Sequence, residues 1–477
     1  MSPIKIEKKF INDLWDQSII PTLIDYVKIP NKSPQFDPHW EEHGYMHEAV
    51  QLIMQWCEQH AYPGMTLEMI QLPHRTPLIY IEIPGDAKET ILLYGHLDKQ
   101  PEMTGWHSDL GPWQPVLRDD RLYGRGAADD GYAAFASLTA LLALHRQNLP
   151  HSRCIILIEA CEESGSYDLP FYIEALSEKI GTPSLIICLD SGCGNYEQLW
   201  LTTSLRGLLG GVLAIDVLTE GIHSGAGSGV VPSPCRLLRQ LINRIEEEAN
   251  GNMVLKDLSV EIPQRRKDQA KQAASVLESS LVAGFPFIPH VQPEAESIEE
   301  LILRRTWKPA LSIIGLEGLP ILEHAGNVTI PSLSVKLSIR LPPTCDAEQA
   351  GRALKKALER DPPYQAKVSF TLQEASKGWN APAEADWLNQ SVQGASLEHF
   401  GQSSMCMGEG GSIPFMGMLG EKFPQAQFVI TGVLGPESNA HGPNEFLHIP
   451  TGKKLTACVA QIIADHYQRN LKPLQQA

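Results

Sequence analysis

The chain lacks several features that would place it in common protein classes. No run of apolar residues approaches the roughly 20 that a membrane-spanning helix needs. The nine cysteines include no C-x-x-C pair, which argues against a disulfide framework and against a structural zinc site. Because 56 acidic residues outnumber 39 basic ones, giving a formal net charge of -17, we expect no nucleic-acid partner. The lysine-rich start lacks the apolar segment of a secretory signal, so we expect a cytoplasmic protein that does not enter a membrane.

The first 200 residues alternate short apolar runs with longer helical patterns. Residues 90–94, 154–158 and 185–189 read as buried strands, and a similar run occurs at 427–431. The alanine- and leucine-rich stretch 132–145 reads as a helix that follows a glycine. Such alternation predicts an α/β fold, with a mainly parallel sheet that carries helices on both faces.

A different pattern occupies the middle of the chain. Residues 208–218 and 332–341 have strand-like composition, and long helical stretches at 233–248 and 266–281 separate them. Strands combined with helices in this way predict a small α+β domain inserted into the larger one. The predicted domains are residues 1–206 with 378–477, and residues 207–377.

Acidic and histidine residues follow the predicted strands or precede the predicted helix. They are His96, Asp98, Asp129, Asp130, Glu162, Glu163, Asp190 and His441. In a doubly wound sheet the carboxyl ends of the strands gather at one edge, where ligand sites form. A single aspartate after a strand is most often a helix cap or a surface turn. Few lysines or arginines accompany this whole set, however, so metal ions are the expected partners of the buried negative charge.

The number and type of these residues suggest two metal ions. Two histidines and three carboxylates hold a pair of ions if one carboxylate bridges them, at the ~3.5–4 Å spacing of dinuclear hydrolases. Imidazole with carboxylate suits zinc first, and also manganese or cobalt. Glu162 and Glu163 are adjacent, so one can bind metal while the other accepts a proton from water. Asp98 can orient the imidazole of His96.

A glycine-rich segment between these residues superficially suggests a dinucleotide site. Gly124, Gly126 and Gly131 do not have the spacing of G-x-G-x-x-G. Two aspartates also stand where a pyrophosphate would bind. We therefore expect no nucleotide there.

Three segments resemble a known family of dinuclear metallopeptidases. They are GHLDKQP at residues 95–101, LYGRGAADD at 122–130 and EESGS at 162–166. The family includes cytosolic nonspecific dipeptidase, carnosinase, glutamate carboxypeptidase, acetylornithine deacetylase and succinyl-diaminopimelate desuccinylase. The similarity runs in order from about residue 95 to residue 445, so it covers most of the chain.

The resemblance implies a role for each residue of the catalytic domain. Asp129 would bridge the two metals and be joined to Asp130 by a cis peptide bond. The remaining ligands would be His96 and Asp190 at one metal, and Glu163 and His441 at the other. Glu162 would be the general base, and Asp98 would lie behind His96.

The same resemblance makes the inserted domain a lid and dimerisation domain. His223, in the segment GIHSG, would reach the site of the partner subunit and stabilise the oxyanion. Arg340 would grip the substrate carboxylate. Gly411 and Ser412 would belong to the loop that holds the substrate terminus. The implied protein is a homodimer that binds short peptides.

Several positions depart from the dipeptidase pattern. Gly221 stands where an acidic residue is expected, and Gly408 stands where an arginine is expected. Residues 327–331 and 436–440 also differ. The predicted activity is hydrolysis of dipeptides or short peptides with a free C-terminal carboxylate. An N-acyl amino acid deacylase on the same scaffold and a catalytically inactive binding homologue remain alternatives.

Overall fold

The computed structural model describes residues 4–411 and 413–469, and these form two compact units. Unit 1 contains the described residues up to Thr202, Ala381–Cys406, and the described residues from Met418 onward. Unit 2 contains Thr203–Asn380 and the described part of Met407–Gly417. The assignment of these parts to catalysis and to a lid stays a prediction. Among the described residues, no helix combines the length and apolarity that a membrane crossing demands.

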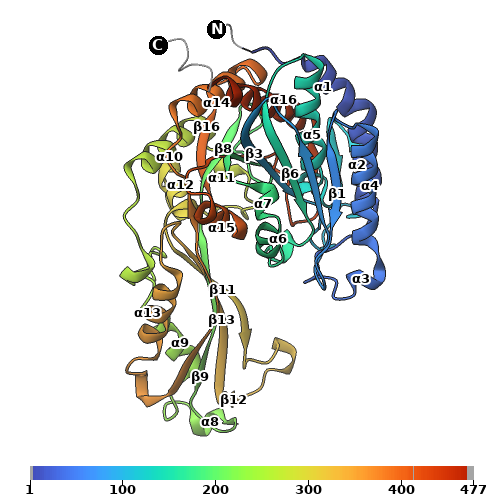
Figure 1. Ribbon diagram of the computed structural model, residues 1–477. Coiled ribbons are helices and arrows are strands. Elements are labelled where there is room, and N and C mark those ends of the chain that lie inside the picture. The colour runs from blue at the N-terminus through green and yellow to red at the C-terminus, as the bar shows by residue number, and fades with distance from the viewer. Residues whose placement is uncertain (1–3, 412, 470–477) are drawn as a thin grey trace. The chain divides into compact units, whose positions relative to one another are not determined.

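Unit 1 is built on a six-stranded sheet (Figure 1). In spatial order its strands are β1 (Thr66–Ile70), β2 (Leu78–Ile83), β6 (Ser152–Glu159), β3 (Ala87–His96), β7 (Pro183–Cys188) and β17 (Gln427–Ile430). The pairs β6–β3, β3–β7 and β7–β17 are parallel, whereas β1–β2 and β2–β6 are antiparallel. The prediction of a mainly parallel sheet is therefore confirmed. Each strand predicted in this part of the chain falls within a strand of the sheet, with at most one residue beyond its end.

Helices of unit 1 connect and cover these strands. The predicted helix is α5 (Ala133–Arg146), which joins β3 to β6, while α6 (Leu169–Ala175) and α7 (Ser177–Ile180) join β6 to β7. Strands β6 and β7 flank β3 on opposite sides. Right-handed crossovers that run in opposite directions put their helices on opposite faces of the sheet. The C-terminal helix α16 (Ile449–Gln468) packs against α5 and β6.

The other helices of unit 1 come from its N-terminal part and from the segment after unit 2. They are α1 (Lys8–Leu14), α2 (Ile20–Lys28), α3 (Trp40–His43), α4 (Tyr45–Gln59) and α14 (Asp386–His399). A small antiparallel sheet joins β4 (Val116–Arg118), β5 (Arg121–Tyr123) and β18 (Phe446–His448). Pairing of β18 with β5 brings the segment that precedes β18 next to the segment that leads into α5.

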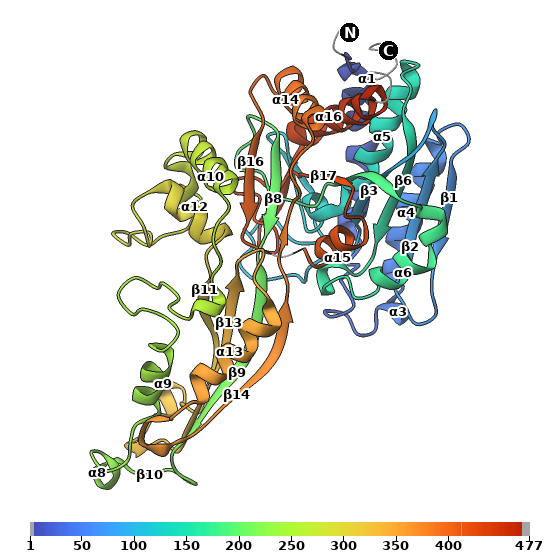
Figure 2. The same cartoon turned by 60° about the vertical axis from the view of Figure 1, so that its left-hand side comes forward.

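Unit 2 is built on a four-stranded antiparallel sheet (Figure 2). Its strands, in spatial order, are β11 (Ala310–Glu317), β13 (Ser332–Leu341), β9 (Gly207–Asp216) and β14 (Lys367–Ser376). Burial alternates along β9, so one face of the sheet forms a core with α9 (Pro234–Ile242) and α13 (Ala347–Glu359). The predicted strands at 208–218 and 332–341 correspond to β9 and β13.

The predicted helices of unit 2 are shorter than expected. The first, predicted over 233–248, is α9 and ends at Ile242. The second, predicted over 266–281, is α10 (Gln264–Leu277), which ends where Glu278 takes a positive φ of 44°. The short helix α11 (Ser280–Ala283) follows it.

The remaining elements are short or carry the chain between the units. Unit 2 also contains α8 (Ser224–Gly227), α12 (Ile298–Thr306), β10 (Ile222–His223), β12 (Val328–Thr329) and β15 (Trp379–Asn380). The chain passes from one unit to the other within β8 (Trp200–Leu205), β16 (Met405–Glu409) and α15 (Pro414–Lys422).

Candidate metal centre

The strand ends of unit 1 bring the predicted ligands together at one edge of the sheet. His96 is the last residue of β3, and Asp190 lies two residues beyond β7. Glu163 lies in the turn that follows β6, and Asp129 lies just before α5. His441 comes from the segment before β18, whose pairing with β5 holds it near this edge.

Two groups of side chains have the geometry of metal sites, and they share one residue. The first group is His96, Asp129 and Asp190, and the second is Asp129, Glu163 and His441. In each group one donor atom per residue lies within 4.8 Å of the others. Oδ1 of Asp129 lies 3.2 Å from Nε2 of His96, whereas Oδ2 lies 3.0 Å from Nε2 of His441. The two carboxylate oxygens of Asp129 therefore face different imidazoles, which is the arrangement that a bridging ligand needs.

The electrostatics of these groups indicate that cations belong there. Burial, with nearby Asp190, raises the pKa of Glu162 well above its usual value, and burial raises the pKa of Asp190 to about 7. Burial and the charge of Asp129 likewise raise the pKa of Glu163. Burial also acts to raise the pKa of Asp129, but hydrogen bonds from His441 and His96 outweigh it and lower that pKa well below normal. The imidazoles alone thus leave the cluster short of positive charge, and its nitrogen and oxygen donors fit two zinc, manganese or cobalt ions.

Asp98 holds the turn that carries both glutamates. Its carboxylate accepts the backbone N–H groups of Glu162 at 3.1 Å and Glu163 at 3.0 Å. The same carboxylate lies 3.5 Å from Nδ1 of His96, and that ring nitrogen is 3.1 Å from the backbone oxygen of Asp98. Asp98 is fully buried, so it can fix the imidazole and the turn at once. Glu162 shares this turn but belongs to neither ligand group.

The segment before α5 adopts an unusual backbone. The peptide bond between Asp129 and Asp130 is cis, as the family resemblance implied. Asp130 is fully buried, and its Oδ2 accepts the backbone N–H of His96 at 3.3 Å. Burial and the charge of Asp190 raise the pKa of Asp130 well above normal.

Three supporting side chains were not identified from the sequence. Gln100 donates from Nε2 to the Glu163 carboxylate at 2.7 Å. Arg125 pairs with Glu445 at 2.7 Å, and both side chains are almost completely buried. Arg125 also donates to the backbone oxygen of Gly442 at 2.7 Å, which fastens the segment that carries His441. Gln100 and Arg125 lie inside the recognised motifs, but the pair joins positions 320 residues apart, which no local pattern could predict.

Among the residues predicted to stabilise the oxyanion or to bind substrate, unit 2 contains His223, Arg340 and Gly411. His223 is exposed and caps α8, where its Nδ1 accepts the backbone N–H of Gly225 at 3.1 Å. Arg340 lies in β13, and burial lowers its pKa. Gly411 is exposed, and its backbone oxygen accepts the backbone N–H of Arg206 at 3.1 Å. Ser412 lies outside the described residues.

The space around position 221 is too small for a side chain unless Val328 moves. A Cβ atom at Gly221 would lie 2.9 Å from Cγ1 of Val328, closer than unstrained carbon atoms approach. Strand β10 pairs with β12 at this point, so the two backbones are held close together. The acidic residue that the dipeptidase pattern expects would need Val328 to move.

Comparison with known proteins identifies the family of this chain. The family model described as peptidase family M20/M25/M40 matches residues 92–465. The cysteinylglycine-S-conjugate dipeptidase of Corynebacterium striatum is 28% identical over 374 residues, covering 76% of this chain and 77% of the relative. The human Beta-Ala-His dipeptidase is 26% identical over 470 residues, covering 93% and 89%. The crystal structure of human carnosine dipeptidase 1 has the same fold, with a TM-score of 0.77 at 21% identity over 98% of this chain and 100% of that one. The chain belongs to peptidase family M20/M25/M40 and is a metallopeptidase.

Proposed function

We propose that this protein hydrolyses dipeptides or other short peptides with a free C-terminal carboxylate, with two divalent ions as cofactors. The observation that carries the proposal is the pair of ligand groups that share Asp129, with Glu162 in the adjoining turn. The names of the two relatives, a cysteinylglycine-S-conjugate dipeptidase and a Beta-Ala-His dipeptidase, support the substrate class. The five predicted metal ligands and the predicted base Glu162 are all present, which disfavours an inactive homologue.

The proposed roles of the side chains follow from their chemistry. When bound, two divalent ions supply a Lewis acid for the scissile carbonyl and acidify a water molecule. Glu162 accepts the proton of that water on a carboxylate oxygen and delivers it to the nitrogen of the leaving amine. Asp98 keeps Glu162 and Glu163 at fixed positions by accepting both backbone N–H groups.

We assign substrate positioning to unit 2. Arg340 would bind the C-terminal carboxylate of the peptide through paired hydrogen bonds, as guanidinium groups commonly do. Gly411 and Ser412 would hold the same terminus through their loop. Gly411 suits this task because an added Cβ would meet no atom of the described residues within 4 Å, apart from its chain neighbours, so a ligand can approach the backbone closely.

We further propose that the protein is a homodimer. Strand β11 lies at an edge of its sheet and exposes Ile313, Ile314 and Leu316. An exposed apolar edge strand invites pairing with another chain, and a second copy of the same edge would bury it. His223 would then serve the site of the partner subunit. The cytoplasmic location stays a prediction.

His223→Ala is expected to lower the turnover number strongly without removing metal. Loss of an oxyanion donor costs ~3–4 kcal/mol by analogy with other oxyanion holes. Metal content should not change, because His223 is exposed on unit 2 and belongs to neither ligand group of unit 1. Turnover and metal content of the purified variant would be measured together.

Subunit exchange tests whether His223 acts across the dimer. Mixing inactive His223→Ala with inactive Glu162→Gln should give heterodimers in which one site has both an intact base and an intact histidine. Activity should therefore reappear in the mixture, with the dimer mass verified by light scattering. Verified heterodimers that stay inactive, or a fully active monomer, would show that the assignment is wrong.

A substrate panel separates the proposed function from its closest alternative. We expect turnover of alanyl dipeptides to exceed that of N-acetyl amino acids, because the proposed class is short peptides. Amidation of the C-terminal carboxylate should raise KM, since Arg340 would lose its ionic partner. Preferred turnover of the N-acetyl amino acids would instead identify a deacylase, and equal turnover of amidated dipeptides would remove the carboxylate requirement.

A further inference from the structure

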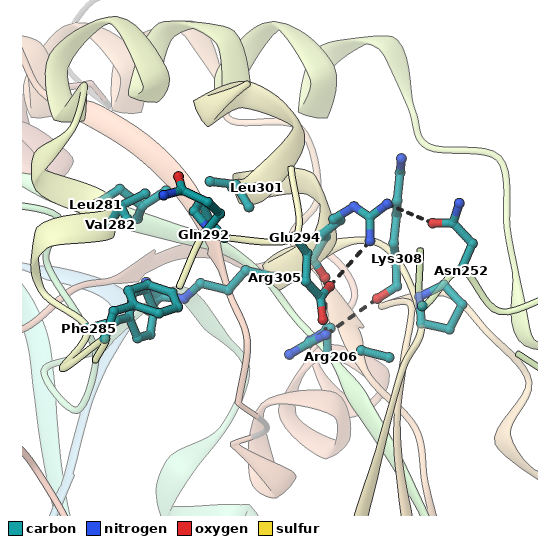
Figure 3. A pocket seen from close by; sticks show the side chains of 16 residues that line it. Arg206, Asn252, Leu281, Val282, Phe285, Gln292, Glu294, Leu301, Arg305 and Lys308 are labelled. Carbon is teal, nitrogen blue, oxygen red and sulfur yellow. Dashed lines mark hydrogen bonds and ion pairs between the residues drawn. The ribbon is translucent and has the colours of Figure 1, made fainter. Parts of the chain in front are cut away.

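Unit 2 contains a pocket that the proposed catalytic chemistry does not use (Figure 3). Its volume is about 380 Å³, at the lower end of the range for small-molecule sites. It forms between α11, α12 and the 14-residue segment 284–297 that links them. Segments of this length without helix or strand are uncommon in compact domains and often have a binding role.

One side of the pocket is apolar and open to solvent. Leu281 and Val282 of α11 line it, together with Phe285, Phe287 and Leu301. The two phenylalanines are 51% and 43% exposed, and their rings pack edge to face with centroids 6.1 Å apart. A ligand that covers such apolar side chains is stabilised by ~25 cal/mol for each Å² of apolar surface removed from water.

The other side of the pocket is cationic. Arg206, Arg304, Arg305 and Lys308 line it, with Glu294 as the acidic residue among the lining side chains. Glu300 and Glu409 contact three of these cations from outside the lining, and a small excess of positive charge still remains in a chain with a net charge of -17. Burial, with the nearby charges of Arg340 and Arg305, lowers the pKa of Arg206 to about 10.

The cations differ in how far their charge is balanced. Arg304 is largely satisfied, because it contacts Glu300 at 3.0 Å and Glu294 at 3.3 Å. Lys308 contacts both oxygens of Glu300 and is 38% exposed on its side chain. Arg305 is 39% exposed on its side chain, and its recorded partner among the described residues is Glu409 at 3.2 Å. In Figure 3 the Arg305 side chain extends across the pocket toward Phe285.

We propose that this pocket binds a small amphipathic carboxylate, with the carboxylate on Arg305 and Lys308 and the apolar part against Leu281, Val282 and Phe285. An apolar wall beside accessible cations matches this chemistry on both sides of the ligand. A neutral apolar molecule would leave the cations without a new partner, and a fully polar anion would leave the phenylalanines in water. A guanidinium group has five donors in a planar fork, so Arg305 can bind a carboxylate in addition to Glu409.

The pocket connects directly to the loop assigned to the substrate terminus. Nε of Arg206 donates to the backbone oxygen of Gly410 at 3.0 Å, and its backbone N–H donates to Gly411 at 3.1 Å. Arg305 contacts Glu409 in the same segment. A carboxylate on Arg305 would share the guanidinium with Glu409 and so alter the contact between Arg305 and this loop. Binding at the pocket itself does not depend on the proposed peptidase activity.

Calorimetric titration of the full chain with octanoate tests the proposal. Octanoate combines a carboxylate with an eight-carbon chain, and octanamide, octylamine and acetate are the comparison ligands. We expect saturable binding of octanoate, with at least about tenfold weaker binding of octanamide, octylamine and acetate. No saturable octanoate binding below its micelle concentration, or equal affinity for octanamide, would overturn the proposal.

Variants locate the binding to this pocket. Arg305→Gln and Val282→Asp should each weaken octanoate binding about tenfold or more. The matched controls are Arg352→Gln and Val230→Asp, which change exposed residues of unit 2 away from the pocket and should bind as the unmodified protein does. Circular dichroism would verify that all four fold. Unchanged affinity in both folded pocket variants would contradict the assignment.

Inhibition kinetics would show whether the natural occupant of the pocket is part of the substrate or a separate ligand. If the pocket receives part of the substrate, octanoate should raise KM for a dipeptide and leave kcat unchanged. If it receives a separate ligand, octanoate should change kcat through the Glu409–Gly411 loop. Either pattern supports the site when Arg305→Gln abolishes it, and persistence of the effect in that variant counts against the site.

Discussion

Replacing Glu162 with glutamine is expected to lower the turnover number by ~10²–10⁴-fold, which is the usual contribution of a general base. The amide has the same shape as the carboxylate but cannot accept a proton from water. The backbone N–H of residue 162 would still donate to Asp98, so the turn should keep its conformation. Because Glu162 belongs to neither ligand group, metal content should stay near that of the unmodified protein.

The neighbouring substitution Glu163→Gln is the matched control. Both glutamates lie in one turn, and both backbones are held by Asp98. The Glu163 carboxylate is 3.2 Å from Nε2 of His441, so its change to an amide should weaken one metal site. Turnover and metal per chain would be measured on both variants. Metal loss in Glu162→Gln with metal retained in Glu163→Gln would reverse the two roles.

The central strands of unit 1 could be predicted because burial dominates their composition. The central segments of these strands, residues 91–93 of β3 and 155–158 of β6, consist of Ile and Leu, and all of these side chains are buried. In unit 2, β11 and β14 gave no comparable signal. Most residues of both strands are exposed or half-buried, so burial imposes no apolar pattern on them, whereas β9 was predicted from its strand-like composition.

The same contrast holds within the candidate site. The sequence indicates a parallel sheet, and parallel strands bring His96, Asp190 and Glu163 together because their carboxyl ends lie at one edge. The two-sided position of Asp129 between His96 and His441 depends on the turn before α5 and on distant segments, and spacing alone does not encode it. The pocket beside α12 could not be predicted either, because its two sides come from separate stretches around residues 206, 252, 281–294 and 301–310.

Removal of metal is expected to have the largest effect on the protein, namely loss of activity. The ligand groups of unit 1 contain three carboxylates and two imidazoles, and one of these carboxylates, Asp129, belongs to both groups. This donor set suits two divalent ions. No serine or cysteine nucleophile motif in the sequence offers another route. Zinc, manganese or cobalt should restore part of the activity when added back.

The most direct measurement combines metal analysis with dipeptide hydrolysis on the same samples. Mass spectrometry of purified, metal-loaded protein should find two divalent ions per chain, and chelated protein should hold neither ion and show no turnover. Asp129→Asn should weaken both sites together, because each ligand group includes that residue. Full hydrolysis by protein shown to be free of metal would contradict the account.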